Sequence, residues 1–191
     1  MSSIKRTTLY FEKPGEQNTK TLLEFVKKYV EKEHIRNIVV ASTTGHTGVQ
    51  AVETFKGYNV VVVTHAYGSR EPGKNELQED YANKIRAGGG KIFSGTHALS
   101  GAERAVRKTF GTIQPLELIA NVLRRFGDGT KVCVEIVLMA ADAGLIPMDK
   151  DVVAIGGTGY GADTALCIHP ANAAKFFDLK IKEVVAKPLD F

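Results

Sequence analysis

Ile38-Val39-Val40-Ala41-Ser42-Thr43-Thr44-Gly45-His46-Thr47-Gly48 is the stretch that decides the fold, because an apolar run breaks directly into a loop rich in hydroxyl groups and glycine. A buried strand at 37–42, a short loop and a helix at 49–55 are therefore predicted in succession. The first N–H groups of a helix are unpaired and carry partial positive charge. We interpret the loop as a phosphate cradle formed by Ser42, Thr43, Thr44, Gly45, His46 and Thr47. The alternative is an ordinary connection with a serine or threonine cap.

Strands and helices alternate along the rest of the first two thirds of the chain. Continuous or alternating apolar runs predict strands at 7–11, 59–64 and 91–94. Helical spacing, with proline or glycine at several ends, predicts helices at 20–32, 75–87, 102–108 and 115–126. Segment 130–143 contains residues that favour either state, and its length of more than about 12 residues favours a helix.

The last part of the chain breaks this alternation. The predicted strands 151–155 and 163–168 lie too close together for a parallel crossover, which needs roughly a dozen residues, so they predict a hairpin. Segment 181–186 is predicted to be a final edge strand. Together these patterns predict one domain over residues 1–191. Its fold class is α/β, with three layers, a mostly parallel sheet, and a late antiparallel hairpin and edge strand.

Polar residues and glycines follow each predicted strand, where ligands bind in open parallel sheets. Besides the first loop, the candidate binding residues are Thr64, His65, Ala66, Tyr67, Thr96, His97, Gly156, Gly157, Thr158 and Gly159. Glycines let a flat ligand or a phosphate approach the backbone, although a glycine-rich hairpin also occurs without a ligand. Tyr67 and Tyr160 could stack on a planar ligand.

Three of the strand ends carry a histidine, which raises the question of a metal site. His46, His65 and His97 could form a three-histidine centre, but no HxH or HExxH clustering supports one, and hydrogen-bonding loop histidines are the alternative. Glu135 stands among apolar residues and needs a partner if it is buried. No catalytic nucleophile can be named from the sequence.

Composition narrows the class of protein. Lysine and arginine number 25 against 21 aspartates and glutamates, giving a net charge of +4. The charges are interspersed and form no basic stripe with aromatics, so we expect no nucleic-acid partner. The two cysteines lie in apolar runs, which is typical of a reducing cytoplasm. No signal peptide and no run of about 18 apolar residues is present, so we expect a soluble protein without a membrane partner.

The chain resembles the C-terminal domain of pyruvate kinase in the run Ile38 to Thr47 and in Val152-Val153-Ala154-Ile155-Gly156-Gly157-Thr158-Gly159. It is most similar to stand-alone, largely archaeal members of that group, which share Phe11-Glu12-Lys13-Pro14-Gly15 and Asn18-Thr19. The resemblance implies that residues 42–47 match the loop that holds a phosphate of the allosteric sugar bisphosphate. His46 takes the place of the usual arginine. The catalytic barrel of the kinase has no counterpart, so pyruvate kinase activity is not implied.

The resemblance to the stand-alone group also implies a bound flavin mononucleotide (FMN). The expected function is therefore binding of a phosphorylated nucleotide, FMN, at the carboxyl ends of the strands, with flavin-dependent chemistry on an unknown substrate left open. One alternative is a non-catalytic regulatory module that senses a sugar phosphate. Another is a metal-dependent hydrolase that uses the loop histidines. The expected partner is a phosphorylated small molecule, and a homo-oligomer is left open.

Overall fold

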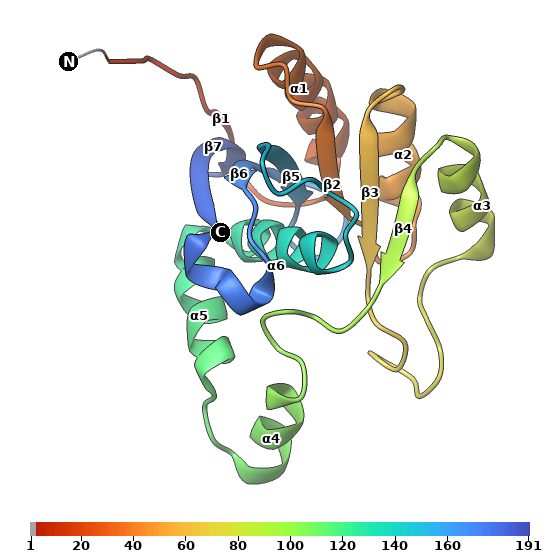
Figure 1. The fold of residues 1–191 in the computed structure, drawn as a ribbon, viewed down its shortest axis with the longest axis vertical. Coiled ribbons are helices and arrows are strands. Elements are labelled where there is room, and N and C mark those ends of the chain that lie inside the picture. Colours follow the sequence, from red (N-terminus) through yellow and green to blue (C-terminus); the bar gives the residue numbers. More distant parts are fainter. Residues whose placement is uncertain (1–2) are drawn as a thin grey trace.

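The computed structural model describes residues 3–191, whose strands form a seven-stranded sheet in the order β1-β7-β6-β5-β2-β3-β4 (Figure 1). The strands are β1 (Leu9–Phe11), β2 (Asn37–Ala41), β3 (Asn59–Thr64), β4 (Lys91–Ser94), β5 (Val152–Gly156), β6 (Thr164–His169) and β7 (Lys180–Pro188). The α-helices are α1 (Thr19–Lys32), α2 (His46–Thr54), α3 (Glu79–Ala87), α4 (Glu103–Phe110), α5 (Pro115–Leu123) and α6 (Asp128–Asp142). Short 3₁₀ turns cover η1 (Glu16–Asn18), η2 (Arg124–Phe126) and η3 (Ala173–Asp178).

The order of the strands creates one point where the chain changes direction across the sheet. From β2 the chain moves to β3 and then β4, both parallel to their neighbours, and it returns through α4, α5 and α6 to β5 on the other side of β2. The carboxyl ends of β2 and β5 are therefore adjacent at a topological switch point. Ligands of open α/β sheets bind at such a point.

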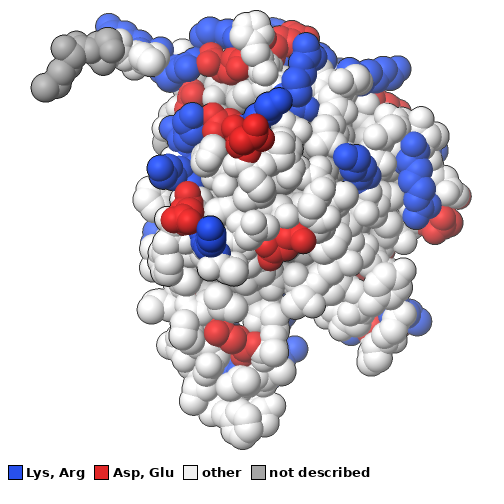
Figure 2. All heavy atoms as spheres, viewed as in Figure 1, with Lys and Arg blue, Asp and Glu red and all other residues white. Residues whose placement is uncertain are grey.

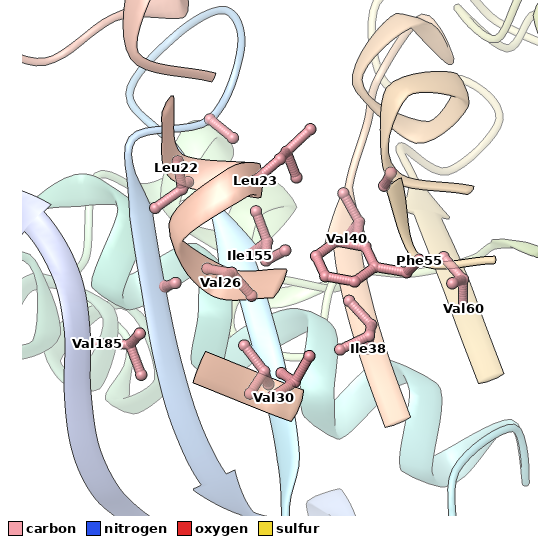
Figure 3. Packing of buried hydrophobic residues seen from close by; sticks show 14 of the residues in the cluster. Leu22, Leu23, Val26, Val30, Ile38, Val40, Phe55, Val60, Ile155 and Val185 are labelled. Carbon is pink, nitrogen blue, oxygen red and sulfur yellow. The ribbon is translucent and has the colours of Figure 1, made fainter. Parts of the chain in front are cut away.

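Helices cover both faces of the sheet, so the molecule has three layers. Leu22, Val26 and Val30 of α1 pack with Phe55 against Ile155 and other side chains of one face (Figure 3). Helices α5 and α6 cover the opposite face, where Val39, Val61 and Ala154 lie. Burial on both faces explains why β2 and β3 are continuous β-branched runs rather than alternating ones.

The predicted α/β fold is confirmed, including the mostly parallel sheet, the late hairpin of β5 with β6, and a helical α6 over the ambiguous segment. The prediction that 181–186 is an edge strand is wrong for the last part of β7. Strand β1 pairs in parallel with residues 186–188 on the outer side of β7, so only the earlier part of β7 lies at an edge. The sequence offered no sign of this pairing, because β1 is three residues long.

Several helix boundaries also differ from the prediction. Helix α2 starts at His46 rather than at 49, because Gly45 turns the chain at a positive φ of 101°. Helix α3 starts at Glu79 rather than at 75, since the Asn75 side chain instead donates to the His65 carbonyl and accepts from the Leu77 N–H. Within residues 3–191, no helix combines the length and the apolar character that crossing a membrane requires.

Candidate functional site

A pocket of about 450 Å³ opens at the carboxyl ends of β2 and β3, beside the loop that follows β5. Strand ends, the first turn of α2 and one long side of α6 form its walls. The lining residues are Glu16, Ala41, Ser42, Thr43, Thr44, His46, Thr47, Val63, Thr64, His65, Arg70, Glu76, His97, Arg124, Asp128, Lys131, Val132, Glu135, Ile136, Met139, Gly157, Gly159, Tyr160 and Gly161. Its volume lies in the range of small-molecule sites.

The loop between β2 and α2 presents unpaired backbone donors to this pocket. The Ser42 hydroxyl oxygen accepts from the Gly48 N–H at 3.0 Å, which satisfies one donor of the first helical turn. The N-cap residue of α2 is Gly45, which has no side chain to cap the helix. Within residues 3–191, the N–H groups of residues 43–47 have no acceptor. Because these donors lie at the positive end of the helix dipole, the loop can hold an anion.

Two glycines fix the position of this loop and helix. A Cβ atom on Gly45 would lie 2.6 Å from Cβ of Tyr81, and one on Gly48 would lie 2.8 Å from Cγ1 of Val62. The first glycine lets α3 approach the loop, and the second lets α2 seat directly on β3. The anion site therefore depends on close packing that larger residues would prevent.

The end of β3 contributes a chain of polar contacts. His65 Nδ1 lies 2.6 Å from Glu76 Oε2, and Arg70 Nε lies 2.8 Å from the other oxygen of that carboxylate. A carboxylate only accepts, so Nδ1 carries a hydrogen. The other ring nitrogen, Nε2, lies within hydrogen-bond distance of the Thr43 hydroxyl, at 3.3 Å. This chain orients Thr43 at the mouth of the anion loop.

A second polar group, formed by His97, Glu135 and Lys131, lies deeper in the wall. One Glu135 oxygen accepts from the Leu99 N–H at 3.0 Å, and the other contacts Lys131 Nζ and lies 3.3 Å from His97 Nδ1. Burial opposes ionisation of Glu135, yet His97 and Lys131 hold its pKa down at about 2. The carboxylate therefore orients the ring, and His97 Nε2 is buried without a partner among the described residues.

Helix α6 supplies the largest set of residues that the sequence analysis did not place in the site. Its pocket-facing residues recur at helical spacing and are Asp128, Lys131, Val132, Glu135, Ile136 and Met139. The helical spacing of these residues is visible in the sequence. Because α6 is buried on nearly all sides, however, the sequence does not show which face of the helix lines the pocket. Gly129 lets the helix approach β6, because a Cβ there would lie 2.1 Å from Thr164 Oγ1.

The glycine loop after β5 is held by a buried aspartate. Asp163 Oδ2 accepts from the N–H groups of Gly15 at 3.1 Å and Thr158 at 3.0 Å. Gly157 and Gly159 face the pocket, whereas Gly156 and Thr158 do not. The Thr158 hydroxyl oxygen is buried without a partner among residues 3–191. The backbone of this loop thus forms an open wall, with Tyr160, 69% exposed, at its rim.

The structure brings most, but not all, of the predicted site residues to one pocket. Those in its lining are Ser42, Thr43, Thr44, His46, Thr47, Thr64, His65, His97, Gly157 and Gly159. Gly45 lies under Tyr81. Tyr67, which is 69% exposed, lies outside the pocket lining, as do Ala66 and Thr96. Glu76, Arg124 and Lys131 belong to the pocket without any motif that marked them.

The three histidines do not form one cluster. The rings of His65 and His97 are 5.1 Å apart between centroids, whereas the His46 ring packs against Tyr81 at 5.7 Å. Among residues 3–191, no three histidine, cysteine, aspartate or glutamate side chains come together in a group that could hold a metal ion. The alternative of a three-histidine hydrolase therefore finds no support in this arrangement.

Comparison with solved structures returns distant likenesses. One is the NH3-dependent NAD synthetase from Campylobacter jejuni in complex with the nitrate ion, at 13% identity and a TM-score of 0.40, covering 75% of this chain and 56% of that one. Another is an O-ureido-L-serine-bound mutant of O-ureido-L-serine synthase, at 18% identity and a TM-score of 0.31, covering 71% and 49%. This chain spans about half the length of these two proteins.

Comparison with protein families gives a more definite result. The model of the pyruvate kinase alpha/beta domain matches residues 20–168, a range that runs from α1 to the end of β6 and includes both loops of the switch point. The match excludes β1 and β7, the two strands at the far side of the sheet. With most of its length matched, the chain belongs to the family of the pyruvate kinase alpha/beta domain.

Proposed function

We propose that this protein binds a phosphorylated small molecule, with FMN as the first candidate, at the switch point of its sheet. The observation that carries the proposal is the run of N–H groups at residues 43–47, which have no acceptor within residues 3–191 and lie beside a pocket of about 450 Å³. A phosphate would accept hydrogen bonds from these groups and from the hydroxyls of Thr44 and Thr47. A helix N-terminus favours that charge.

The other walls are compatible with the rest of an FMN molecule. The backbone of Gly157 and Gly159 offers a surface without side chains, and Ile136 and Met139 of α6 offer apolar contacts. His97 belongs to the lining, and its Nε2, which is buried without a partner among residues 3–191, could accept or donate a hydrogen bond if the ring turned towards a ligand. Bound FMN would supply hydride or electron transfer, while this chain would hold the phosphate and orient the ligand.

The charged side chains of the pocket are mostly paired with one another, so an anionic ligand group would bind to the backbone N–H groups at the start of α2. Arg70, Arg124 and Lys131 are each paired with a carboxylate, at Glu76, Asp128 and Glu135 respectively. These cations are therefore largely neutralised within the wall. The backbone of the α2 turn is then the main attraction for phosphate, which explains how a site without the usual arginine at position 46 could still hold one.

The direct test is FMN uptake by the purified protein. We expect absorbance near about 450 nm, typical of flavin, after purification or after addition of FMN. The double variant Thr44→Val and Thr47→Val removes two hydroxyl donors without changing side-chain shape. Its FMN dissociation constant should rise by about 100- to 10,000-fold, since each of the two lost hydrogen bonds to a charged group contributes about 1.5 to 3 kcal/mol. Fluorescence titration of FMN measures it.

Thr54→Val is the matched control. Thr54 lies at the opposite end of α2, where its hydroxyl donates to the Gln50 carbonyl, so this variant should bind FMN as the parent protein does. Equal losses in both variants would contradict the proposed phosphate position. A colourless protein that takes up no FMN, but melts at higher temperature with a sugar bisphosphate, would favour the sugar-phosphate sensor instead.

A further inference from the structure

A second cavity, of about 240 Å³, lies beside the first, beneath α4 and α5. Its lining holds the basic residues Arg104, Arg107, Arg124 and Lys131 and the acidic residues Glu103 and Glu117. Basic side chains thus outnumber acidic ones. The first pocket differs, because its lining includes the acidic residues Glu16, Glu76, Asp128 and Glu135 against Arg70, Arg124 and Lys131.

Both acidic residues of the second cavity are already engaged by the protein. A Glu103 oxygen accepts from the Leu116 N–H at 2.9 Å, which ties the start of α5 to α4. Glu117 pairs with Arg107. In the part of the chain that the structure describes, no carboxylate lies within ion-pair distance of Arg104. A guanidinium is therefore available at the cavity with no internal counter-charge.

The cations also act on one another. Lys131 is only 8% exposed, and burial lowers the pKa of its ammonium group while Glu135 opposes the change. The charges of Arg124 and Arg104 act in the same direction as burial. Arg124 and Lys131 are paired with Asp128 and Glu135, so among the described residues Arg104 is the cation of this group left for an outside anion.

The two cavities share a wall made of His97, Arg124 and Lys131. The His97 ring lies in both linings, with Nδ1 turned to Glu135 and Nε2 free of any partner within residues 3–191. A molecule in the second cavity would therefore lie next to a ligand in the first, with this ring between or beside them.

We propose that the second cavity binds a small anionic molecule, bearing a carboxylate or phosphate, as the co-substrate of the ligand in the first pocket. The planar guanidinium of Arg104 suits either group, because it can donate two parallel hydrogen bonds to an anion. The volume restricts the molecule to a size below that of most drug-sized ligands. The pairing of the two ligands rests on the function proposed above, whereas the anion site itself rests on its own residues.

Calorimetric titration of the intact protein with malonate and, separately, with inorganic phosphate tests the anion site. We expect malonate to bind, and Arg104→Gln to weaken it about tenfold or more, because that variant removes a charge-assisted contact. Arg125→Gln is the matched control, since Arg125 is exposed on the adjacent turn and outside both linings. It should leave the malonate affinity unchanged.

The double variant Thr44→Val and Thr47→Val separates this inference from the proposed function. It should leave malonate binding intact while weakening the phosphate bound at α2. Absence of malonate binding, or equal losses in Arg104→Gln and Arg125→Gln, would overturn the second site. Phosphate binding that is lost only in the threonine variant, together with malonate binding that Arg104→Gln does not weaken, would retain the first site and reject the second.

Discussion

Glu135 shows at the scale of one residue how a buried charge can be both structural and functional. Its carboxylate contacts Lys131, His97 and the Leu99 N–H, and the residue is 3% exposed. The sequence indicated that this carboxylate needs partners, because valine and isoleucine flank it. It could not indicate which partners, since His97 and Leu99 come from the segment after β4, far along the chain.

Replacing Glu135 with glutamine should destabilise the fold by about 3 kcal/mol. The change leaves the Lys131 ammonium buried without its counter-charge, and breaking a buried pair on one side is costly. Urea unfolding followed by circular dichroism measures the free energy. Glu79→Gln is the control, because Glu79 pairs with Arg86 at the surface and should contribute less than about 1 kcal/mol. Equal effects would contradict a buried role for Glu135.

The same carboxylate predicts a loss of stability in acid. Its pKa is about 2 in the folded protein against an ordinary value of 4.5, so its stabilising effect is complete above pH 4.5 and is lost as the pH falls towards 2. The free energy of unfolding should therefore decrease between these values, and less steeply in Glu135→Gln. An identical slope for both proteins, in unfolding curves recorded across this range, would show that Glu135 is not ionised preferentially in the folded state.

At the scale of elements, α2 and α6 differ in how well the sequence located them. The break from Ala41 into Ser42 and Gly45 marked α2 and its loop, because a strand, a turn glycine and a helix each have a local pattern. Helix α6 supplies six residues of the pocket lining, yet its apolar residues occur on all sides. Its role depends on the tertiary contact at Gly129 with β6, which no local pattern shows.

Gly48→Ala tests how closely α2 sits on β3. Without a contact, alanine would stabilise a helix by about 1 kcal/mol relative to glycine. Here the new Cβ would lie 2.8 Å from Val62 Cγ1 and 2.9 Å from Ile85 Cδ1, so overpacking of about 1 to 3 kcal/mol should outweigh that gain. We expect a lower melting temperature and weaker FMN binding. Glu53→Ala, on the exposed side of α2, is the control, and a stabilised Gly48→Ala protein would contradict this packing.

At the scale of the whole molecule, the topology of the sheet brings together residues that no individual motif connects. The β-α alternation predicted the layers, and the short link after β5 predicted the hairpin, because chain length limits which crossovers are possible. The sequence could not show that β1 returns to β7, or that residues from α6 and the segment after β4 meet at the switch point. The placement of charge also depends on the fold. On the face shown in Figure 2, the lower end formed by α4 and α5 is mostly white, whereas these helices contribute Arg104 and Arg107 to the lining of the second cavity.

A ligand that binds only the folded molecule should raise its melting temperature. At 100 times the dissociation constant the gain is about 2.7 kcal/mol, which corresponds to about 5 to 10 °C for a chain of this size. Differential scanning calorimetry with and without FMN measures the shift. The double variant Thr44→Val and Thr47→Val should need a higher FMN concentration for the same shift, whereas Thr54→Val should match the parent protein.

The backbone amide spectrum of the protein, recorded by NMR during titration with FMN, tests most directly whether the first turn of α2 holds a phosphate. The account predicts that the amide signals of residues 43–47, which have no acceptor among the described residues, move furthest and towards lower field as hydrogen bonds to phosphate form. Saturable FMN binding that leaves these amide signals in place and shifts signals elsewhere would contradict it.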